Sequence, residues 1–361
     1  MSAGGALLRL IEAAAADGHT VVPVGVAGSL LSGLGLRLEV AMREVGPGGS
    51  ALVSAPTASV LGFRTLVGAE QSIARAVQAR AADGRLRVIV GPAGAPRSDA
   101  VAACGAQAVV ADDCEYLDVE TLATFFASCA DDELVVLAGD LAGLGSPGAG
   151  RAFADIAESD AVAVTRVGSG PAGGGVLRGF AAQVASGTPA AIDDPTREVV
   201  IVPAATGAEV AHRVVQLVRD SIPRAFALAT SDIQVLTATS TGDCGPAALA
   251  ERLAALGAPP AMLVGEALGR SWPAVVFAVA PSSAGLLSRS LIYSAITRAA
   301  THLSVVQGAG RAFAEAVERD SDRRRTLLPG LLTVPPMPPG PPSPGDYASS
   351  SDSHSRSSSS S

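Results

Sequence analysis

An eight-residue stretch that follows an apolar run has the outline of a phosphate-binding loop, GxxxxGK[ST]; it reads GPAGAPRS over 91–98. In a working loop, backbone N–H groups, a flexible glycine and a lysine ammonium hold the β and γ phosphates of a nucleotide. Here Pro96 stands in place of the glycine and Arg97 in place of the lysine, so one N–H donor is lost and a planar guanidinium replaces a compact charge. Gly91 and Ser98 fit the pattern. The alternative interpretation is a strand-to-helix turn that is rich in small residues.

Acidic residues follow the next two apolar runs of the chain. Asp112 and Asp113 come directly after the run 109–111, and Asp140 follows the run 134–138 with one glycine between. Carboxylates at such positions can bind Mg²⁺ and orient a water molecule for attack on a phosphate. For Asp112 and Asp113 a solvated strand end is the open alternative.

Short apolar runs alternate with helical patterns from residue 70 onward, which predicts the elements that would position these side chains. The expected strands are 86–90, 108–111, 134–138, 161–165 and 199–202, then 233–237, 274–280 and 303–306. The expected helices are 70–82, 119–130, 151–158 and 208–220, then 246–256, 288–300 and 311–319. Strands that are apolar throughout and separated by helices favour parallel sheets covered on both faces.

The pattern divides the chain into four parts. A helical N-terminal region is expected over 1–67, with helices over 6–16 and 30–45. A first α/β domain is expected over 68–224 and a second over 225–330, with the boundary near Ile222. Residues 331–361 are rich in proline and serine, and such a segment buries too little apolar surface to offset the entropy of ordering, so a disordered tail is expected.

Composition excludes several classes of function. A net charge of −8 with 3% aromatic residues argues against tight autonomous binding of nucleic acid, and no lysine is available for catalysis. The four cysteines and four histidines lack the spacing of a zinc site, and His302 is expected to be a packing residue. No signal peptide and no apolar run long enough to span a membrane is evident, so a soluble cytoplasmic protein is expected.

Further motifs occur in a fixed order along the chain. Residues 137–140 (LAGD) resemble helicase motif III, 233–237 (IQVLT) the opening of a second motor core, and 269–276 (GRSWPAVV) motif V. Residues 293–299 (YSAITRA) are close to the motif VI signature YTALTRA. Together these motifs resemble the RecD-like branch of superfamily 1 DNA helicases with a UvrD-type C-terminal core. The resemblance covers roughly 70–328 and implies two RecA-like domains of the P-loop type.

The resemblance also implies roles for particular residues. The nucleotide ATP would be contacted by four residues of the first loop and by one after the third strand: Gly91, Gly94, Arg97, Ser98 and Asp140. Mg²⁺ would be held by Ser98 and Asp112, and the catalytic residues would be Asp112, Asp113 and Arg298. Arg298 would reach across the cleft as an arginine finger. The open alternative for Arg298 is a structural ion pair between the domains.

Many reactive residues of the family are replaced in this chain. Gly143 stands where motif III has its glutamine, and motif V has Gly265, Leu268 and Ser271 in place of its polar residues. Two DNA-contacting insertions of the family are also missing. We therefore expect a RecD-like DNA helicase homologue with ATPase and unwinding activities weakened or lost, which binds single-stranded DNA weakly and has a possible protein partner. The alternative is a non-catalytic pseudo-helicase that acts as a DNA-associated or protein-interaction scaffold.

Overall fold

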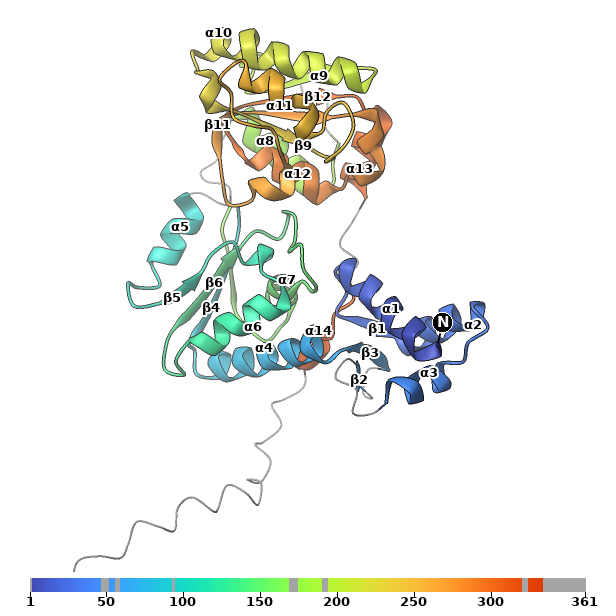
Figure 1. Cartoon of the computed structure of the whole chain (residues 1–361). Helices are drawn as coiled ribbons and strands as arrows, with labels where there is room; N and C mark the ends of the chain where they lie inside the picture. The colour runs from blue at the N-terminus through green and yellow to red at the C-terminus, as the bar shows by residue number, and fades with distance from the viewer. Residues whose placement is uncertain are drawn as a thin grey trace, which may run out of the picture.

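A computed structural model describes most of the chain as an N-terminal region and two α/β bodies (Figure 1). The described residues are 2–46, 52–55, 59–92, 95–168, 175–189, 194–319 and 324–333. Both bodies contain a parallel sheet, which confirms the expected pair of α/β domains. Of the tail expected to be disordered over 331–361, residues 331–333 instead belong to a helix, because their apolar side chains pack on the first body, and the rest lies outside the described residues.

The first body is built on four parallel strands in the order β5-β6-β4-β7. They are β4 (Leu86–Val90), β5 (Val109–Ala111), β6 (Val135–Gly139) and β7 (Val164–Arg166). The strand β6 is buried at every position, because helices cover the sheet on both faces. Four of the five strands expected in the first domain are present here; β4 has the expected bounds, and the bounds of the other three differ by one to three residues.

Helices α4 (Arg64–Ala82), α6 (Val119–Ser128) and α7 (Ala152–Glu158) cover one face of this sheet. The opposite face is packed against α5 (Ala95–Ala102), which begins within the candidate phosphate loop. Alternate residues of β4 and β6 therefore contribute to two different apolar clusters, as the pleat of a strand requires. Helix α6 begins where Asp118 accepts a hydrogen bond from the backbone N–H of Thr121.

The second body has five parallel strands in the order β10-β9-β11-β12-β8. They are β8 (Val199–Pro203), β9 (Ile233–Thr237), β10 (Met262–Leu263), β11 (Trp272–Val279) and β12 (Ala299–Gln307). Six helices cover the two faces. One face carries α8 (Val176–Ala185), α12 (Arg289–Thr297) and α13 (Arg311–Glu318), and the other carries α9 (Gly207–Gln216), α10 (Ile222–Phe226) and α11 (Pro246–Ala254).

Short irregular helices complete the two bodies. A π-helical turn, Leu217–Ser221, joins α9 to α10 without a break. The 3₁₀ turns are Cys114–Tyr116, Thr230–Asp232, Val264–Ala267 and Pro281–Leu286. The turn at Cys114–Tyr116 begins after Asp113, whose backbone is left-handed, with φ 53°.

The position of β8 corrects the expected domain boundary near Ile222. Strand β8 pairs with β12 in the second sheet, where Val199 lies opposite Leu303, and α8 and α9 pack on that sheet as well. The chain therefore passes from the first body to the second between residues 168 and 175. A short apolar strand can pair with either sheet, and the sequence pattern does not distinguish the two.

The N-terminal region contains three helices, α1 (Ala3–Ala16), α2 (Val24–Gly33) and α3 (Leu38–Val45). It also contains an antiparallel sheet that was not expected, formed by β1 (Val21–Pro23), β3 (Val60–Phe63) and β2 (Leu52–Ala55) in that order. No single helix in the described ranges is long and apolar enough to cross a membrane; α2 and α3 together pass by length and composition but are bent by 106°.

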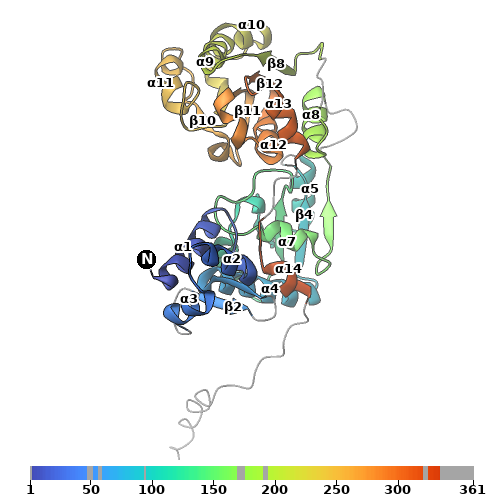
Figure 2. The same ribbon diagram turned by 90° about the vertical axis from the view of Figure 1, so that its right-hand side faces the viewer.

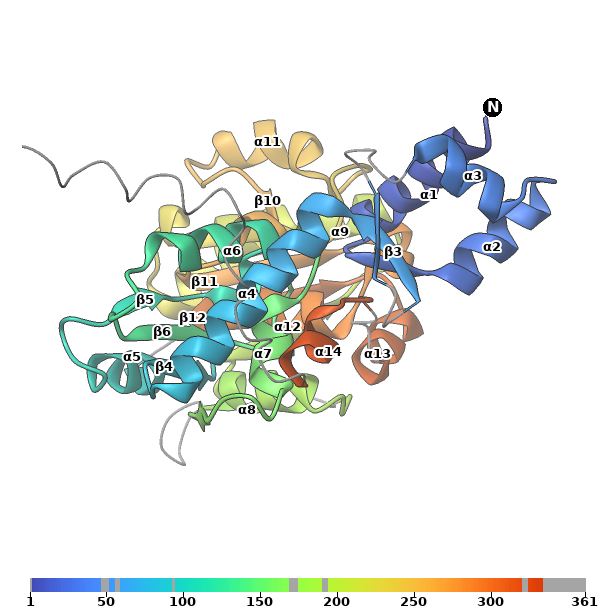
Figure 3. The ribbon, with the colours of Figure 1, turned by 90° about the horizontal axis from the view of Figure 1, so that it is seen from below.

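The end of the described chain returns to the first body, although residues up to 330 were expected in the second. Helix α14 (Leu328–Thr333) packs beside α4 and α7, as the views in Figure 2 and Figure 3 show. Leu328 and Leu332 are buried in the core of the first body. The expectation failed because the apolar residues of this short segment do not indicate which core they enter.

A buried carboxylate, Glu70 of α4, joins three parts of the chain that are distant in sequence. Its Oε1 accepts a hydrogen bond of 2.9 Å from the Thr20 hydroxyl, and its two oxygens accept from the Leu327 N–H at 3.1 and 3.2 Å. The side chain is fully buried. Burial raises the pKa of Glu70 from 4.5 to about 7, and Asp155 raises it further, while the hydrogen bonds from Thr20 and Leu327 lower it.

We expect Glu70→Gln to stabilise the protein above pH 7 relative to the wild type. Because the folded state binds the Glu70 proton more tightly than an unfolded chain, this group favours folding below pH 4.5 and loses that contribution as the pH rises to about 7. The loss amounts to about 3 kcal/mol, and glutamine, which can still accept both hydrogen bonds, escapes it. Urea unfolding from pH 5 to 8 measures the difference. The exposed Glu120→Gln is the control, and parallel pH profiles for wild type and Glu70→Gln would contradict the expectation.

Candidate functional site

The candidate side chains gather at one edge of the first sheet. Because parallel strands end at the same edge, Gly91 after β4, Asp112 after β5 and Asp140 after β6 lie at neighbouring strand ends. The crevice outside the carboxyl ends of a parallel sheet is where ligands bind in open α/β folds. The residues that the sequence singled out therefore lie together at this edge of the sheet. The edge faces the second body.

Arg97 points back into the first body and is only 3% exposed. Its guanidinium forms ion pairs with Asp113 and, at 3.1 Å, with Asp112, and it donates a hydrogen bond of 3.3 Å to the Gly91 carbonyl. The left-handed backbone at Asp113 lets the chain turn sharply into the 3₁₀ turn that follows. In this arrangement the charge of Arg97 is compensated within the protein, so a phosphate has to compete with two carboxylates for it.

The remaining loop residues do not join this cluster in the described part of the chain. Ser98 is exposed on α5, and its hydroxyl makes no hydrogen bond to a described residue. Gly94 lies outside the described residues. Among the residues that are described, no group of three or more His, Cys, Asp or Glu side chains is arranged to hold a metal ion. The Mg²⁺ site of Ser98 and Asp112 stays a prediction.

Asp140 links the two bodies directly. Its Oδ2 accepts a hydrogen bond of 2.7 Å from the Tyr293 hydroxyl on α12, while its Oδ1 accepts from the Ala142 N–H at 3.0 Å. Four residues after Asp140, the Leu144 N–H donates to the Ser294 hydroxyl at 2.8 Å. Tyr293 and Ser294 are buried, so these bonds lie in a seam between the bodies. Tyr293 and Ser294 are neighbours in the motif over 293–299, and both therefore contact the loop that follows β6.

Arg298 lies at the end of α12 and is 7% exposed. One of its terminal nitrogens donates to the Thr297 hydroxyl at 3.3 Å, but its buried Nε has no partner, and it forms no ion pair with any described residue. Burial raises the pKa of the Tyr116 and Tyr293 phenols, and the nearby Arg298 charge lowers both, which locates the guanidinium close to the seam. A buried cation without a counter-charge is costly, so this position is suited to an anion.

Glu115 is a potential site residue that the sequence reasoning did not identify. It lies on the 3₁₀ turn after Asp113, and its Oε2 accepts a hydrogen bond of 3.0 Å from the Asp140 N–H. Burial raises the pKa of Glu115 from 4.5 to about 7, with Asp113 adding to the rise. The feature of the sequence that could have identified Glu115 is its position two residues after Asp113. A carboxyl group that titrates near neutral pH is suited to proton transfer.

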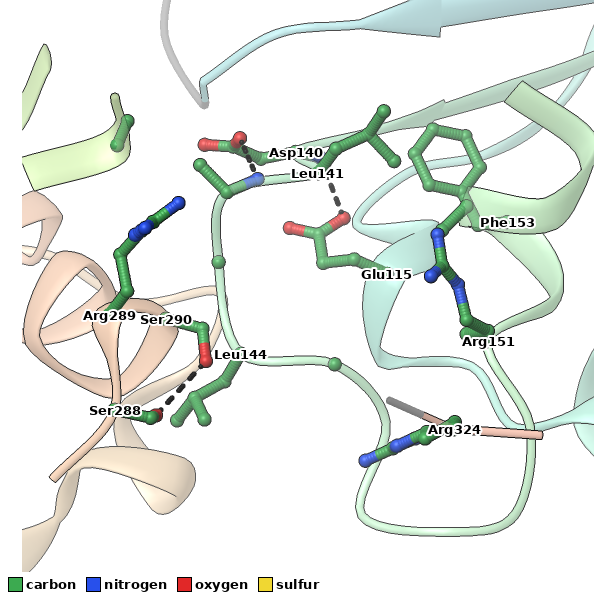
Figure 4. A pocket seen from close by; sticks show the side chains of 15 residues that line it. Glu115, Asp140, Leu141, Leu144, Arg151, Phe153, Ser288, Arg289, Ser290 and Arg324 are labelled. Atoms are coloured by element: carbon green, nitrogen blue, oxygen red, sulfur yellow. Dashed lines mark hydrogen bonds between the residues drawn. The ribbon is translucent and has the colours of Figure 1, made fainter. Parts of the chain in front are cut away.

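Glu115 and Asp140 border a cavity of about 300 Å³ between the two bodies (Figure 4). Arginines line it from both sides. On the second body, Arg289 donates to the carbonyls of Val317 and Glu318. On the first body, Arg324 donates to three carbonyls of the loop after β6, those of Ser146, Gly148 and Gly150. Figure 4 also shows Arg151 beside this cavity, where it forms ion pairs with Asp155, at 3.2 Å, and with Glu158. An anionic ligand would have to compete with these partners for the guanidinium groups of the wall.

No protein-family model and no curated protein matches this chain. Three solved helicase structures are similar to it. They are arterivirus nonstructural protein 10 (15% identity, TM-score 0.33, 68% of this chain and 59% of that one), the same arterivirus protein in complex with DNA (14%, 0.36, 72% and 69%), and the PRRSV helicase (13%, 0.30, 66% and 54%). The chain thus spans 59% of the length of the first of these proteins. The contacts between residues of this chain are therefore the basis for its proposed function.

We expect Tyr293→Phe to destabilise the protein by about 2 kcal/mol, because Asp140 loses a hydrogen bond that crosses the seam. The matched control is Tyr116→Phe, since the Tyr116 hydroxyl makes no hydrogen bond to a described residue although it lies beside the same seam. Urea unfolding of both variants at pH 7 gives the comparison. Equal losses in the two variants would show that the bond between the bodies contributes nothing measurable.

Proposed function

We propose that this chain is a RecD-like superfamily 1 helicase homologue that binds the phosphates of a nucleotide between its two α/β bodies. The observation that carries the proposal is Arg298, a buried guanidinium without an ion pair among the described residues, on the second body. The carboxyl edge of the first sheet faces the same seam. A phosphate that enters there would supply the counter-charge that Arg298 lacks.

ATP is the proposed nucleotide, and Mg²⁺ would accompany it. Gly91 and Ser98 would lie beside the phosphates at the end of β4. Asp112, whose side chain is 52% exposed, would approach the metal through water once its ion pair with Arg97 opens. Arg97 would have to leave its carboxylate partners before it could contact a phosphate. Weak nucleotide binding follows from that competition.

Nucleic acid is the proposed second ligand. The cavity between the bodies is lined by three arginines that a phosphate backbone could contact only in competition with their present partners, and the net charge of −8 supplies little long-range attraction. Both facts favour weak, salt-sensitive contact with single-stranded DNA. Binding of this kind would couple to the nucleotide site through the loop after β6, because that loop borders the cavity and carries Asp140.

A second candidate function is that of a non-catalytic pseudo-helicase, which acts as a scaffold for DNA or protein partners. The ion pairs of Arg97 with Asp112 and Asp113 favour it, because they neutralise the residues that would otherwise hold the nucleotide and its metal. Such a pseudo-helicase would keep both α/β bodies, and the ion pairs of Arg97 would keep nucleotide out of the site.

We expect a fluorescent ATP analogue with Mg²⁺ to bind with micromolar affinity, and Arg298→Ala to weaken binding at least about tenfold, or about 1.4 kcal/mol. Arg252→Ala on the surface of α11 is the control. Absence of binding at millimolar nucleotide would rule out the first function and leave the scaffold. An ATPase assay with and without single-stranded DNA then tests the motor function, because stimulation requires both ligand sites and their coupling.

We expect Asp113→Asn to strengthen nucleotide binding by about fivefold, or about 1 kcal/mol, because it removes one of the two ion pairs that retain Arg97. The same titration measures it, with Asp99→Asn on the exposed side of α5 as the matched control. An unchanged affinity in Asp113→Asn would mean that Arg97 does not limit access to the site.

A further inference from the structure

A second cavity, of about 480 Å³, lies in the second body and is separate from the seam between the bodies. It opens where the edge strand β8 meets the π-helical turn and α10, on the face of the sheet opposite α12. Its wall is mainly apolar, with Phe226 as its aromatic residue and a few polar side chains, among them His302 and Ser304. This composition is typical of a small-molecule site.

His302 and Ser304 form a hydrogen-bonded pair at this cavity. They are two residues apart on β12 and therefore share one face of the sheet, and His302 Nε2 lies 2.7 Å from the Ser304 hydroxyl oxygen. His302 Nδ1 lies 2.7 Å from the Arg197 carbonyl oxygen, which can only accept. Neutral His302 must then carry its proton on Nδ1, so Nε2 accepts the hydroxyl proton of Ser304. This is the relation of a general base to a serine nucleophile.

The surroundings fix the imidazole in this orientation. The Asp194 carboxylate accepts hydrogen bonds from the Thr196 and Val199 N–H groups and so shapes the loop that carries the Arg197 carbonyl. Arg197 itself has a left-handed backbone, with φ 59°, a conformation that is uncommon outside glycine. On the other side Phe226 packs on the ring, with centroids 4.4 Å apart. Burial lowers the pKa of His302, so the ring is neutral, the form a base requires, at neutral pH.

Two further residues with hydrogen-bond donors border the cavity. Arg197, from the loop before β8, and Ser221, from the π-helical turn, line it together with the pair. A guanidinium or hydroxyl that reached a developing negative charge would stabilise the transition state of acyl transfer. Nucleophile, base and orienting carbonyl thus lie at one mainly apolar space.

We propose that Ser304 and His302 form a nucleophilic site for small esters with an apolar acyl group. The Ser304 oxygen bonds to the acyl carbon while its proton passes to His302 Nε2, and the ester C–O bond breaks as the leaving alkoxide takes that proton. Water then attacks the acyl-serine, His302 transfers a water proton to the serine oxygen, and the carboxylic acid leaves. The site is independent of the nucleotide seam.

Packing is the competing explanation, since a buried histidine and serine can satisfy each other without reacting. Ser283 provides the matched control for it. Like Ser304 it is a buried serine of the second body, but its hydroxyl donates to the Ala280 carbonyl at 2.7 Å and has no histidine beside it. Burial and domain are therefore matched, whereas Ser283 lies on the 3₁₀ turn Pro281–Leu286 and has neither the base nor a position at the cavity.

The test treats the full chain with a biotinylated alkyl fluorophosphonate, whose phosphorus bonds to an activated serine oxygen as fluoride leaves. Mass spectrometry of the labelled wild-type protein identifies the modified residue without any variant. We expect Ser304 to carry the label, Ser304→Ala to lose it, His302→Gln to react at least about 100-fold more slowly, and Ser283→Ala to react as the wild type does.

Absence of label on wild-type Ser304 would overturn the proposal and leave the pair as packing. Equal labelling rates in the wild type and in a folded His302→Gln variant would overturn it as well, because the serine would then not depend on the base. Thermal unfolding of each variant shows whether it is folded, and the wild-type mass-spectrometric result decides the question even if a variant is not.

Discussion

The buried carboxyl of Glu70 is the contact on which the arrangement of the first body depends. It holds Thr20 of the N-terminal region and Leu327 of the returning segment against α4, and the Thr20 N–H adds a direct hydrogen bond of 2.9 Å to the Arg325 carbonyl of the same segment. The same returning segment carries Arg324, which fixes the loop after β6 through three carbonyls. That loop also carries Asp140 and the contacts to α12, so the segment that Glu70 helps to hold lies next to the residues that join the two bodies.

Local pattern was enough to predict most of the regular structure. The strands β4 and β9 have the bounds that their apolar runs indicate, and helix α11 begins at the expected proline. The pattern did not predict where an element packs when its packing partners are distant in the sequence. Strand β8 could not be assigned to its sheet, and the return of α14 could not be anticipated, because six or fewer apolar residues fit either core equally well.

The candidate site was predictable in its location and less so in its contacts. Strand ends in a parallel sheet meet at one edge, so the proximity of Asp112 and Asp140 followed from the order of the elements. The partners of Arg97 did not follow, because a flexible guanidinium near two carboxylates and a loop has several possible positions, and the choice is made by tertiary packing. Glu115 was missed because its pKa depends on burial, which the sequence does not reveal.

The course of the chain has a mechanical consequence. Because α14 returns to the first body, the whole second body is an insertion, entered between residues 168 and 175 and left between 319 and 324. The polypeptide therefore crosses between the bodies twice. Cleavage of the backbone at either crossing leaves the two bodies covalently joined through the other. Any change in the relative position of the two bodies must therefore be accommodated at both crossings together.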